Sequence, residues 1–544
     1  IEARFTRSTF SCTLSCTLKL HAFKKGHTMT IHFFRIAVLI SVLTGSATGC
    51  ATNPVTGKSE ITFVSQEREI AIGRQQYLPA QQTQGGLYLV DRELTQYVRE
   101  VGNRLAAVSD NPLPYEFVVV NDSTPNAWAL PGGKIAIHRG LLLQLDNEAE
   151  LAAVLSHEIV HAAARHGAKS MERAMLLQGA LVLTAMGTRD SDYSNYIVGG
   201  ASLGAQLISQ RYGRQAELEA DLYGMRYMAK AGYDPSAAIT LQEKFVALNE
   251  KHSASWIEGL FASHPPSEQR VATNRQTNEA IKASQFKDWE KGASRFQQRL
   301  SYLDSMDDAY RAFDQANVLL AKKENSVARS RVDRAISLEP AEPRFYGLKA
   351  DIFFNEHKYK DAVSMYDTAV SKDEGYYEYY LGRGIAHSKL GNRNKARLDL
   401  ERSNQLLPTA LATNELGRLA LQAGDRDIAK NYFAQVADAD GPLRQSATLS
   451  YVRLDIADNP SKYFKIKSER RQGRFHSIVT NHSGLVIRSG VVAFSATING
   501  RQYQTQRNIG SIAVNSKMGI YAGWKLDDSD TVENIEVRMV RVRL

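Results

Sequence analysis

Cysteine is the residue that this sequence of 544 residues most plainly lacks. Only three are present, at positions 12, 16 and 50, and none follows Cys50. A mature chain that began at Cys50 could form no internal disulfide, so a disulfide framework is excluded. Stability must therefore come from buried cores, and a chain of this length predicts several domains.

A long apolar run is missing as well. The apolar stretch at residues 36–43 is shorter than the roughly 20 residues that span a bilayer. It follows Met29 and a basic residue, and small residues then lead to Cys50, which is the pattern of a secretory signal. The end of this segment resembles a bacterial lipobox. We expect upstream non-native translation in residues 1–28, a lipoprotein signal peptide in 29–49 and a lipid on Cys50. A signal cleaved nearby and a short membrane anchor are the alternatives.

Net charge is small once the first 49 residues are set aside. The whole chain carries +9, but residues 1–49 contribute six Lys or Arg against one Glu. The remainder holds 61 basic and 57 acidic residues, a net charge of +4. Nucleic-acid partners require a strongly basic surface, so we expect no nucleic-acid partner.

A His-Glu-x-x-His motif at residues 157–161 is the most informative feature that is present. It continues an apolar run, residues 151–155, that predicts a buried helix. Positions i and i+4 share a helix face, so His157 and His161 can bind one zinc ion. Glu158 lies beside them as the general base for an attacking water molecule. The motif predicts a zinc peptidase with one zinc ion per chain.

A catalytic zinc site needs a third protein ligand and one open position. Residues 217–221 offer that ligand, since Glu217 and Asp221 share a helix face at i and i+4. One carboxylate can bind the metal while the other accepts a hydrogen bond from a ligand histidine. Glu219 points elsewhere, and we expect it to be solvated or paired with a basic residue.

Two other histidines lie near the motif along the chain. His166 follows His161 by five residues, off its helix face, and we expect it to cap the helix end beside Gly167. His138 follows a predicted strand, and we expect it at the surface.

Short strands and a helical hairpin are predicted on either side of the motif. Residues 117–120 have the pattern of a buried strand, and a turn at residues 126–133 leads into an alternating edge strand. Backbone groups of an edge strand can bind an extended substrate. The predicted substrate-binding residues are Lys134, Ile135, Ala136 and Ile137. Residues 174–208 predict a helical hairpin beside the site, or alternatively a mobile lid or membrane-facing element.

The chain repeats itself between residues 305 and 440. Ala328, Ala362, Ala396 and Ala429 lie 34, 34 and 33 residues apart, and a small residue stands twelve positions before each. Small residues at these offsets let paired helices approach closely, and the period is that of tetratricopeptide repeats. We expect a concave surface for peptides or partner proteins.

Residues 465–544 change in character. Residues with the alternating pattern of β-strands lie on both sides of the turn residues Asn499 and Gly500, which predicts a β-hairpin. The alternation of apolar residues shifts by one position near Met539, which predicts a β-bulge. The expected fold class is therefore mainly α and multidomain. It comprises a zincin-like α+β peptidase domain at 50–295, an α-solenoid of tetratricopeptide repeats at 303–440 and a small C-terminal β-sandwich at 462–544.

Several segments together resemble one family of zinc metallopeptidases, the HtpX and CAAX prenyl protease family, and most closely its BepA-like periplasmic members with tetratricopeptide repeats. The matching segments are residues 53–58, 126–133, 157–161, 217–221 and 264–270. The repeats extend the likeness to about residue 440, and the β domain falls outside it. The occurrence of all five segments in this order is far more specific for the family than the HExxH motif alone.

The resemblance implies roles for single residues. Glu217 would be the third zinc ligand, as in gluzincins, and Asp221 would orient a ligand histidine. His264 and Arg270 would be catalytic and could donate hydrogen bonds to the tetrahedral oxyanion. Alternatively, His264 occupies the open zinc position and holds the enzyme latent. The family usually has Ser-Arg just before its glutamate, whereas residues 213–214 are Gly-Arg, so a role for that hydroxyl is absent here.

The resemblance also implies a function. We expect a zinc-dependent endopeptidase of the periplasm that cleaves unfolded or misassembled outer-membrane proteins, with repeats that dock substrates or the barrel-assembly machinery. Ala51 after the lipid-bearing Cys50 fits sorting to the outer membrane. The alternative is a chaperone or scaffold for envelope protein assembly with a latent zinc site. A prenyl-protein protease is disfavoured because the sequence has no long membrane spans.

Overall fold

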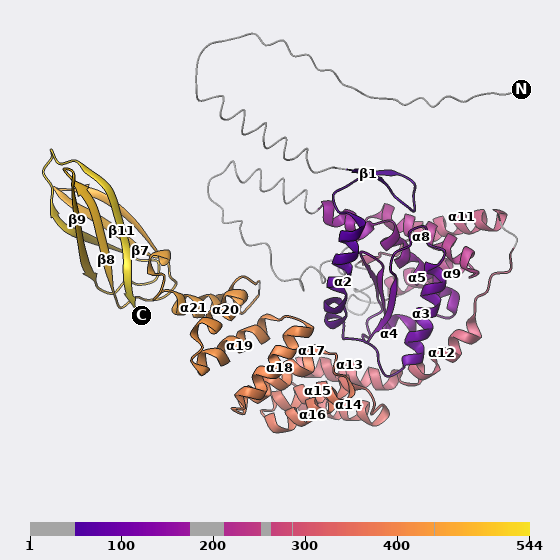
Figure 1. Cartoon of the computed structure of the whole chain (residues 1–544). Coiled ribbons are helices and arrows are strands. Elements are labelled where there is room, and N and C mark those ends of the chain that lie inside the picture. The colour runs from indigo at the N-terminus through magenta and orange to yellow at the C-terminus, as the bar shows by residue number, and fades with distance from the viewer. Residues whose placement is uncertain (1–48, 174–210, 252–262, 285–286, 440) are drawn as a thin grey trace, which may run out of the picture. The chain divides into compact units, whose positions relative to one another are not determined.

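The computed structural model describes residues 49–173, 211–251, 263–284, 287–439 and 441–544 (Figure 1). The predictions for residues 1–28, for the signal peptide up to residue 48 and for the whole 174–208 hairpin lie outside the described residues. Within them, no helix is both long enough and apolar enough to cross a membrane. Cys50 lies in strand β1 (Gly49–Thr52), which pairs with β2 (Ser59–Thr62) in a two-stranded sheet.

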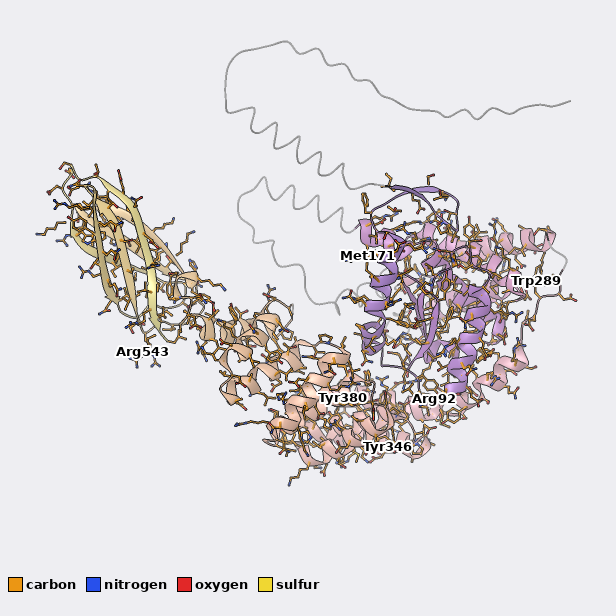
Figure 2. All side chains as sticks on the ribbon, in the orientation of Figure 1. Arg92, Met171, Trp289, Tyr346, Tyr380 and Arg543 are labelled. Atoms are coloured by element: carbon orange, nitrogen blue, oxygen red, sulfur yellow. The ribbon has the colours of Figure 1, made fainter. Side chains whose placement is uncertain are left out.

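The indigo-to-magenta part of Figure 1 consists of helices around a small sheet. Its elements are α2 (Gln66–Thr83), α3 (Arg92–Ala106), β3 (Glu116–Val120), β4 (Ala127–Leu130), β5 (Lys134–His138), α4 (Arg139–Leu142), α5 (Glu148–Ala163), α8 (Arg214–Ala231), α9 (Ala237–Lys251), α11 (Glu268–Ser284) and α12 (Ala293–Ser305). Helix α5 begins at Asn147, whose side chain accepts a hydrogen bond from the Glu150 N–H. Gly232 caps the C-terminal end of α8 with a φ of 90°, which glycine adopts without steric cost. Trp289, labelled in Figure 2, donates its indole N–H to the Ala229 carbonyl near that end.

The sheet has the order β3–β5–β4, so β5 is its central strand. β5 runs parallel to β3 and antiparallel to β4, and all five of its residues are buried. The prediction that residues 134–137 form an edge strand for substrate was therefore wrong. The cause is the turn at Gly132 and Gly133, both with positive φ, which returns the chain between β3 and β4. Among the described strands, none pairs with the other edge of β4.

Helices α5 and α8 lie close together because a glycine faces the motif. A Cβ atom on Gly224 would come within 3.2 Å of Ser156 Oγ and 3.3 Å of the His157 backbone nitrogen. A larger residue at position 224 would push the two helices apart. This contact brings the carboxylates of α8 alongside the histidines of α5.

The repeats follow as antiparallel helix pairs. The helices are α13 (Asp307–Ala321), α14 (Asn325–Leu338), α15 (Pro343–Asn355), α16 (Tyr359–Lys372), α17 (Tyr377–Lys389), α18 (Arg393–Leu406), α19 (Ala410–Ala423), α20 (Arg426–Ala437) and α21 (Arg444–Asp455). All four alanines of the repeat spacing are fully buried. A Cβ atom on Gly417 would lie 2.9 Å from the Phe433 ring, so the small residues do let paired helices approach. The predicted solenoid is confirmed; Tyr346 and Tyr380 in Figure 2 belong to its helices α15 and α17.

The first repeats share a buried core with the sheet. Arg139, just after β5, places its guanidinium carbon 3.4 Å from the centre of the Tyr310 ring. The same guanidinium donates to Asn121 Oδ1, just after β3, and the Asn121 amide donates to Glu342. The Tyr310 hydroxyl also donates to Glu342, at 2.7 Å. The carboxyl ends of β3 and β5 are thereby tied to α13 and the start of α15.

The C-terminal part consists of two three-stranded antiparallel sheets that enclose one apolar core. Its elements are a short 3-10 helix η1 (Pro460–Tyr463) and strands β6 (Phe464–Arg471), β7 (Arg474–Asn481), β8 (Ser489–Ile498), β9 (Arg501–Ile509), β10 (Lys517–Lys525) and β11 (Val532–Arg543). Asn499 and Gly500 both have positive φ and join β8 to β9, which confirms the hairpin. The register of β11 against β8 shifts between Met539 and Arg541, which confirms the bulge.

The repeat core gives a first testable prediction. Ala396→Leu adds bulk at a fully buried position between α17 and α18, and overpacking there is expected to cost about 1–3 kcal/mol of unfolding free energy. Urea unfolding followed by circular dichroism measures the change. Leu398→Ala, on the same helix but 58% exposed, is the control and should leave the transition nearly unchanged. Equal midpoints for Ala396→Leu and the parent would contradict the close helix approach.

Candidate active site

Helix α5 turns the first two donor atoms of the site toward α8. The His157 and His161 Nε2 atoms lie 3.0 Å apart, and both rings are largely buried. His157 Nδ1 lies 3.0 Å from Asp221 Oδ1, so Nδ1 carries the hydrogen and Nε2 presents a lone pair. Two lone pairs that face each other at this distance repel, unless a cation lies between them.

Glu217 and His264 bring two more donor atoms to the same point. Glu217 Oε1 lies 3.4 Å from His161 Nε2 and 3.1 Å from His264 Nδ1. His264 Nδ1 in turn lies 3.3 Å from His157 Nε2. The four residues offer one ligand atom each, all within 4.8 Å of one another.

These distances fit zinc. Tetrahedral zinc with bonds of about 2.0–2.2 Å to nitrogen and oxygen sets neighbouring ligand atoms roughly 3.3 Å apart. Four of the separations between the imidazole nitrogens and Glu217 Oε1 run from 3.0 to 3.4 Å, and all the ligand atoms lie within 4.8 Å of one another. The donor set of three imidazoles and one carboxylate is also one that zinc accepts. The cluster could therefore hold a zinc ion with four protein donors.

Asp221 is the carboxylate that links the three helices of the site. It accepts from His157 on α5 and from Arg270 on α11, whose Nε and Nη2 donate at 2.7 and 2.6 Å. Burial alone would raise the pKa of Asp221, but Arg270 outweighs burial and holds that pKa below its usual value. Asp221 thus remains an anion that orients the His157 ring.

Arg270 lies beside the donor cluster, as the resemblance implied, and binds two carboxylates there. Its guanidinium is buried, and besides the two bonds to Asp221 its Nη1 lies 2.8 Å from Glu217 Oε2 and donates to the Pro265 carbonyl. Arg270 therefore neutralises the two carboxylates and holds them in place, and its role as a donor to the oxyanion stays a prediction. Sequence spacing could not show these contacts, because an arginine reaches far from its own backbone position.

Glu158 is buried beside the donor cluster. Its Oε1 atom lies 3.5 Å from His264 Nε2, and burial raises the pKa of the carboxyl group. A carboxylate with a raised pKa accepts and returns a proton more readily near neutral pH. A small pocket of about 40 Å³ opens next to it, with apolar walls that include Leu141, Leu241 and Phe245.

Two histidines lie where the sequence did not predict them. His138 was expected at the surface but is buried, with Nδ1 2.9 Å from the Thr124 carbonyl oxygen. His166 was expected to cap a helix end; instead it is buried with Nδ1 3.0 Å from His161 Nδ1. Arg165 explains the second error. Its φ of 63° breaks the helix and turns His166 back toward His161, whereas a continuing helix would carry it away.

Glu219 and Tyr212 contact the two histidines at the end of α5. Glu219, predicted to be solvated or paired with a basic residue, is paired with Lys58. A hydrogen bond from His166 and the nearby Lys58 lower the pKa of Glu219 to about 2. The Tyr212 ring stacks on His161 with ring centroids 3.9 Å apart. This contact was not predicted from the sequence.

Both the peptidase region and the repeats match known protein families. The model of peptidase family M48 matches residues 92–278, and the tetratricopeptide-repeat model matches residues 313–377 and 414–456. The mitochondrial metalloendopeptidase OMA1 of Schizosaccharomyces pombe is 32% identical over 237 residues, which are 43% of this chain and 67% of that protein. The chain belongs to peptidase family M48. The predicted metalloendopeptidase class and the resemblance are both confirmed.

Bacterial relatives of this M48 peptidase carry the name beta-barrel assembly-enhancing protease. The Yersinia pestis protein is 26% identical over 63% of this chain and 74% of its own length. The Escherichia coli K12 protein is 30% identical over 44% of this chain and 51% of its own length. A Vibrio cholerae relative is matched over 39% of its length, so the chain spans about half or less of two of these relatives.

The buried Arg270 of this M48 peptidase gives a second prediction. Arg270→Met leaves two buried carboxylates without their cation, which is expected to cost about 3–5 kcal/mol of unfolding free energy. Thermal unfolding followed by circular dichroism measures it. The matched control on the same helix is Arg275→Met, whose exposed pair with Glu243 should be worth about 1 kcal/mol or less. Equal losses in the two variants would refute the neutralising role of Arg270.

Proposed function

We propose that this chain is a zinc-dependent endopeptidase that hydrolyses peptide bonds in unfolded or misassembled proteins. The convergence of four donor atoms within 4.8 Å of one another, three of them on buried residues and with Glu158 beside them, carries the proposal. His157, His161 and Glu217 are the ligands, and one zinc ion is held per chain. Zinc at this point supplies a Lewis acid for the scissile carbonyl group and for the attacking water molecule.

The side chains divide the remaining work. Glu158 takes a proton from the attacking water and later gives it to the leaving amine. Asp221 keeps the hydrogen of His157 on Nδ1, so that the lone pair of Nε2 stays directed at the metal position. The pocket beside Glu158 is lined by Leu141, Leu241 and Phe245, which supports a preference for an apolar substrate side chain next to the cleaved bond.

One edge of β4 pairs with no described strand, and it replaces the predicted strand as the place for an extended substrate. Asn126 accepts from the His138 N–H across the β4–β5 pair, so Ala127 and Ala129 direct their backbone groups away from β5. Backbone hydrogen bonds select an extended chain rather than a particular sequence. This supports unfolded segments as substrates.

His264 supports a resting form of low activity. Its Nδ1 lies among the other ligand atoms, 3.1 Å from Glu217 Oε1 and 3.3 Å from His157 Nε2, which is the fourth position of a tetrahedron. An imidazole at that position excludes the substrate carbonyl and water. We therefore prefer the latent role of His264 to the oxyanion role, and cleavage requires the ring to move away.

The sequence and the bacterial relatives support a location and partners for the enzyme. The signal-like start and Cys50 support a periplasmic enzyme, lipid-anchored at the outer membrane. The name of the bacterial relatives supports outer-membrane barrel proteins as substrates and the barrel-assembly machinery as a partner of the repeats. The second candidate, a chaperone or scaffold with a latent zinc site, is favoured by the same position of His264.

The variant Glu158→Gln distinguishes the proposed endopeptidase function from the scaffold function. The amide keeps the size of the side chain but cannot accept the proton, so cleavage of a denatured outer-membrane barrel protein should fall by about 10²–10⁴-fold with zinc content unchanged. Gel-based cleavage rates and metal analysis of the purified protein provide the readouts. Glu100→Gln, on the surface of α3, is the matched control. A zinc-loaded parent that cuts no faster than the variant, even after His264 is replaced, would favour the scaffold.

His264→Ala tests the resting form. Removal of the fourth donor should raise cleavage at least about tenfold, which corresponds to a bias of about 1.4 kcal/mol toward the closed form. Zinc should also be held less tightly. The exposed His482→Ala serves as control and should change neither quantity. A fall in kcat with zinc still bound would instead assign His264 to the transition state.

A further inference from the structure

The two ligand histidines on α5 are supported differently. His157 donates directly to a carboxylate, Asp221, at 3.0 Å. His161 Nδ1 instead lies 3.0 Å from His166 Nδ1, and the carboxylate next to this ring, Glu217, faces its other nitrogen, Nε2. Metal-bound histidines nearly always donate their other N–H to a carboxylate, a carbonyl or water. The His161–His166 contact takes the place of that partner.

The hydrogens in this contact follow from the geometry. His161 Nε2 lies among the ligand atoms, so the hydrogen of a neutral ring is on Nδ1 and is donated to His166 Nδ1. His166 then carries its own hydrogen on Nε2, which lies 3.4 Å from Glu219 Oε2. The hydrogen of His161 is therefore directed at His166, and the Glu219 carboxylate lies near the nitrogen that bears the hydrogen of His166.

Glu219 is held from the N-terminal side of the chain. Lys58 Nζ lies 3.2 Å from Glu219 Oε1, and Gln215 donates to the same oxygen. Lys58 ends a short segment in which Asn53 donates its amide to the Ala164 carbonyl, beyond the last residue of α5. The Asn53 oxygen accepts from the backbone at Val55 and so closes the turn. This segment thus packs against the same helix end that positions His166.

We propose that His166 is the positioning residue for His161, completed by Glu219 and Lys58. The inference rests on the proposed zinc site. His166 fixes which nitrogen of His161 bears the hydrogen and how the ring is turned toward the metal. Without an acceptor at this place, the buried Nδ1–H of His161 would have no partner, and the ring could rotate or reverse its tautomer.

A series of variants tests the proposal by zinc affinity, measured on the purified chain in competition with a chelating dye. His166→Leu removes the acceptor and should weaken zinc binding about 10–100-fold. His166→Asn should recover most of that loss, because its Oδ1 atom replaces the accepting Nδ1. Glu219→Gln keeps an acceptor but removes the charge, so its effect should be smaller, and that of the more exposed Lys58→Met should be smaller still.

The control is His476→Leu, which alters an equally buried histidine in the β domain and should leave zinc affinity unchanged. Cobalt-substituted protein adds a readout that packing alone would not move. The visible absorption bands of cobalt should shift in His166→Leu and return toward the parent in His166→Asn, because they report the ligand geometry.

The outcomes are distinct. Zinc affinity of His166→Leu equal to that of the parent overturns the proposal, and so does a His166→Asn variant as weak as His166→Leu. Should His166→Leu fail to fold, Glu219→Gln decides: unchanged zinc affinity overturns the proposal, and a loss supports it. A parent that binds no zinc overturns the proposed function itself. If the parent binds zinc and cleaves, and the His166 variants bind zinc as tightly as the parent, only the positioning role is overturned.

Discussion

The neutralisation of buried charge is the constraint on which the site depends. Three carboxylates of the site, Glu158, Glu217 and Asp221, are buried, and buried charges are tolerated only when they are paired. Arg270 pairs with two of them and thereby fixes α11 against α8. The geometry of the ligand atoms follows from this arrangement, since Asp221 in turn orients His157.

Close helix packing makes that pairing possible. Gly224 lets α8 approach the backbone of α5 at His157, and the carboxylates of α8 reach the imidazoles only at that separation. Small residues also permit close packing in the repeats, where buried alanines and glycines let paired helices approach each other. The segment from Asn53 to Lys58, which precedes the first helix of the domain, then closes the far end of α5. Elements distant in sequence thus support one small cluster of atoms.

Much of the fold and of the site was predictable because the signals are local. The i, i+4 spacing of His157 and His161 requires only a helix, and the 34-residue period of buried alanines requires only stacked helix pairs. The turn at Asn499 and Gly500 and the bulge near Met539 likewise depend on a few adjacent residues. Each of these features is set by the backbone geometry of one short segment.

The errors share a different origin. The sequence by itself determined the metallopeptidase motif, the repeats and the hairpin, since periodicity and turn chemistry act within about ten to thirty residues. Only the tertiary structure decided that residues 134–137 form the central strand, that Arg270 binds carboxylates and that His166 supports His161. Strand order depends on which segments pair across the sheet. A single left-handed residue, Arg165, redirects His166, and contacts of this kind arise only when the whole domain has folded.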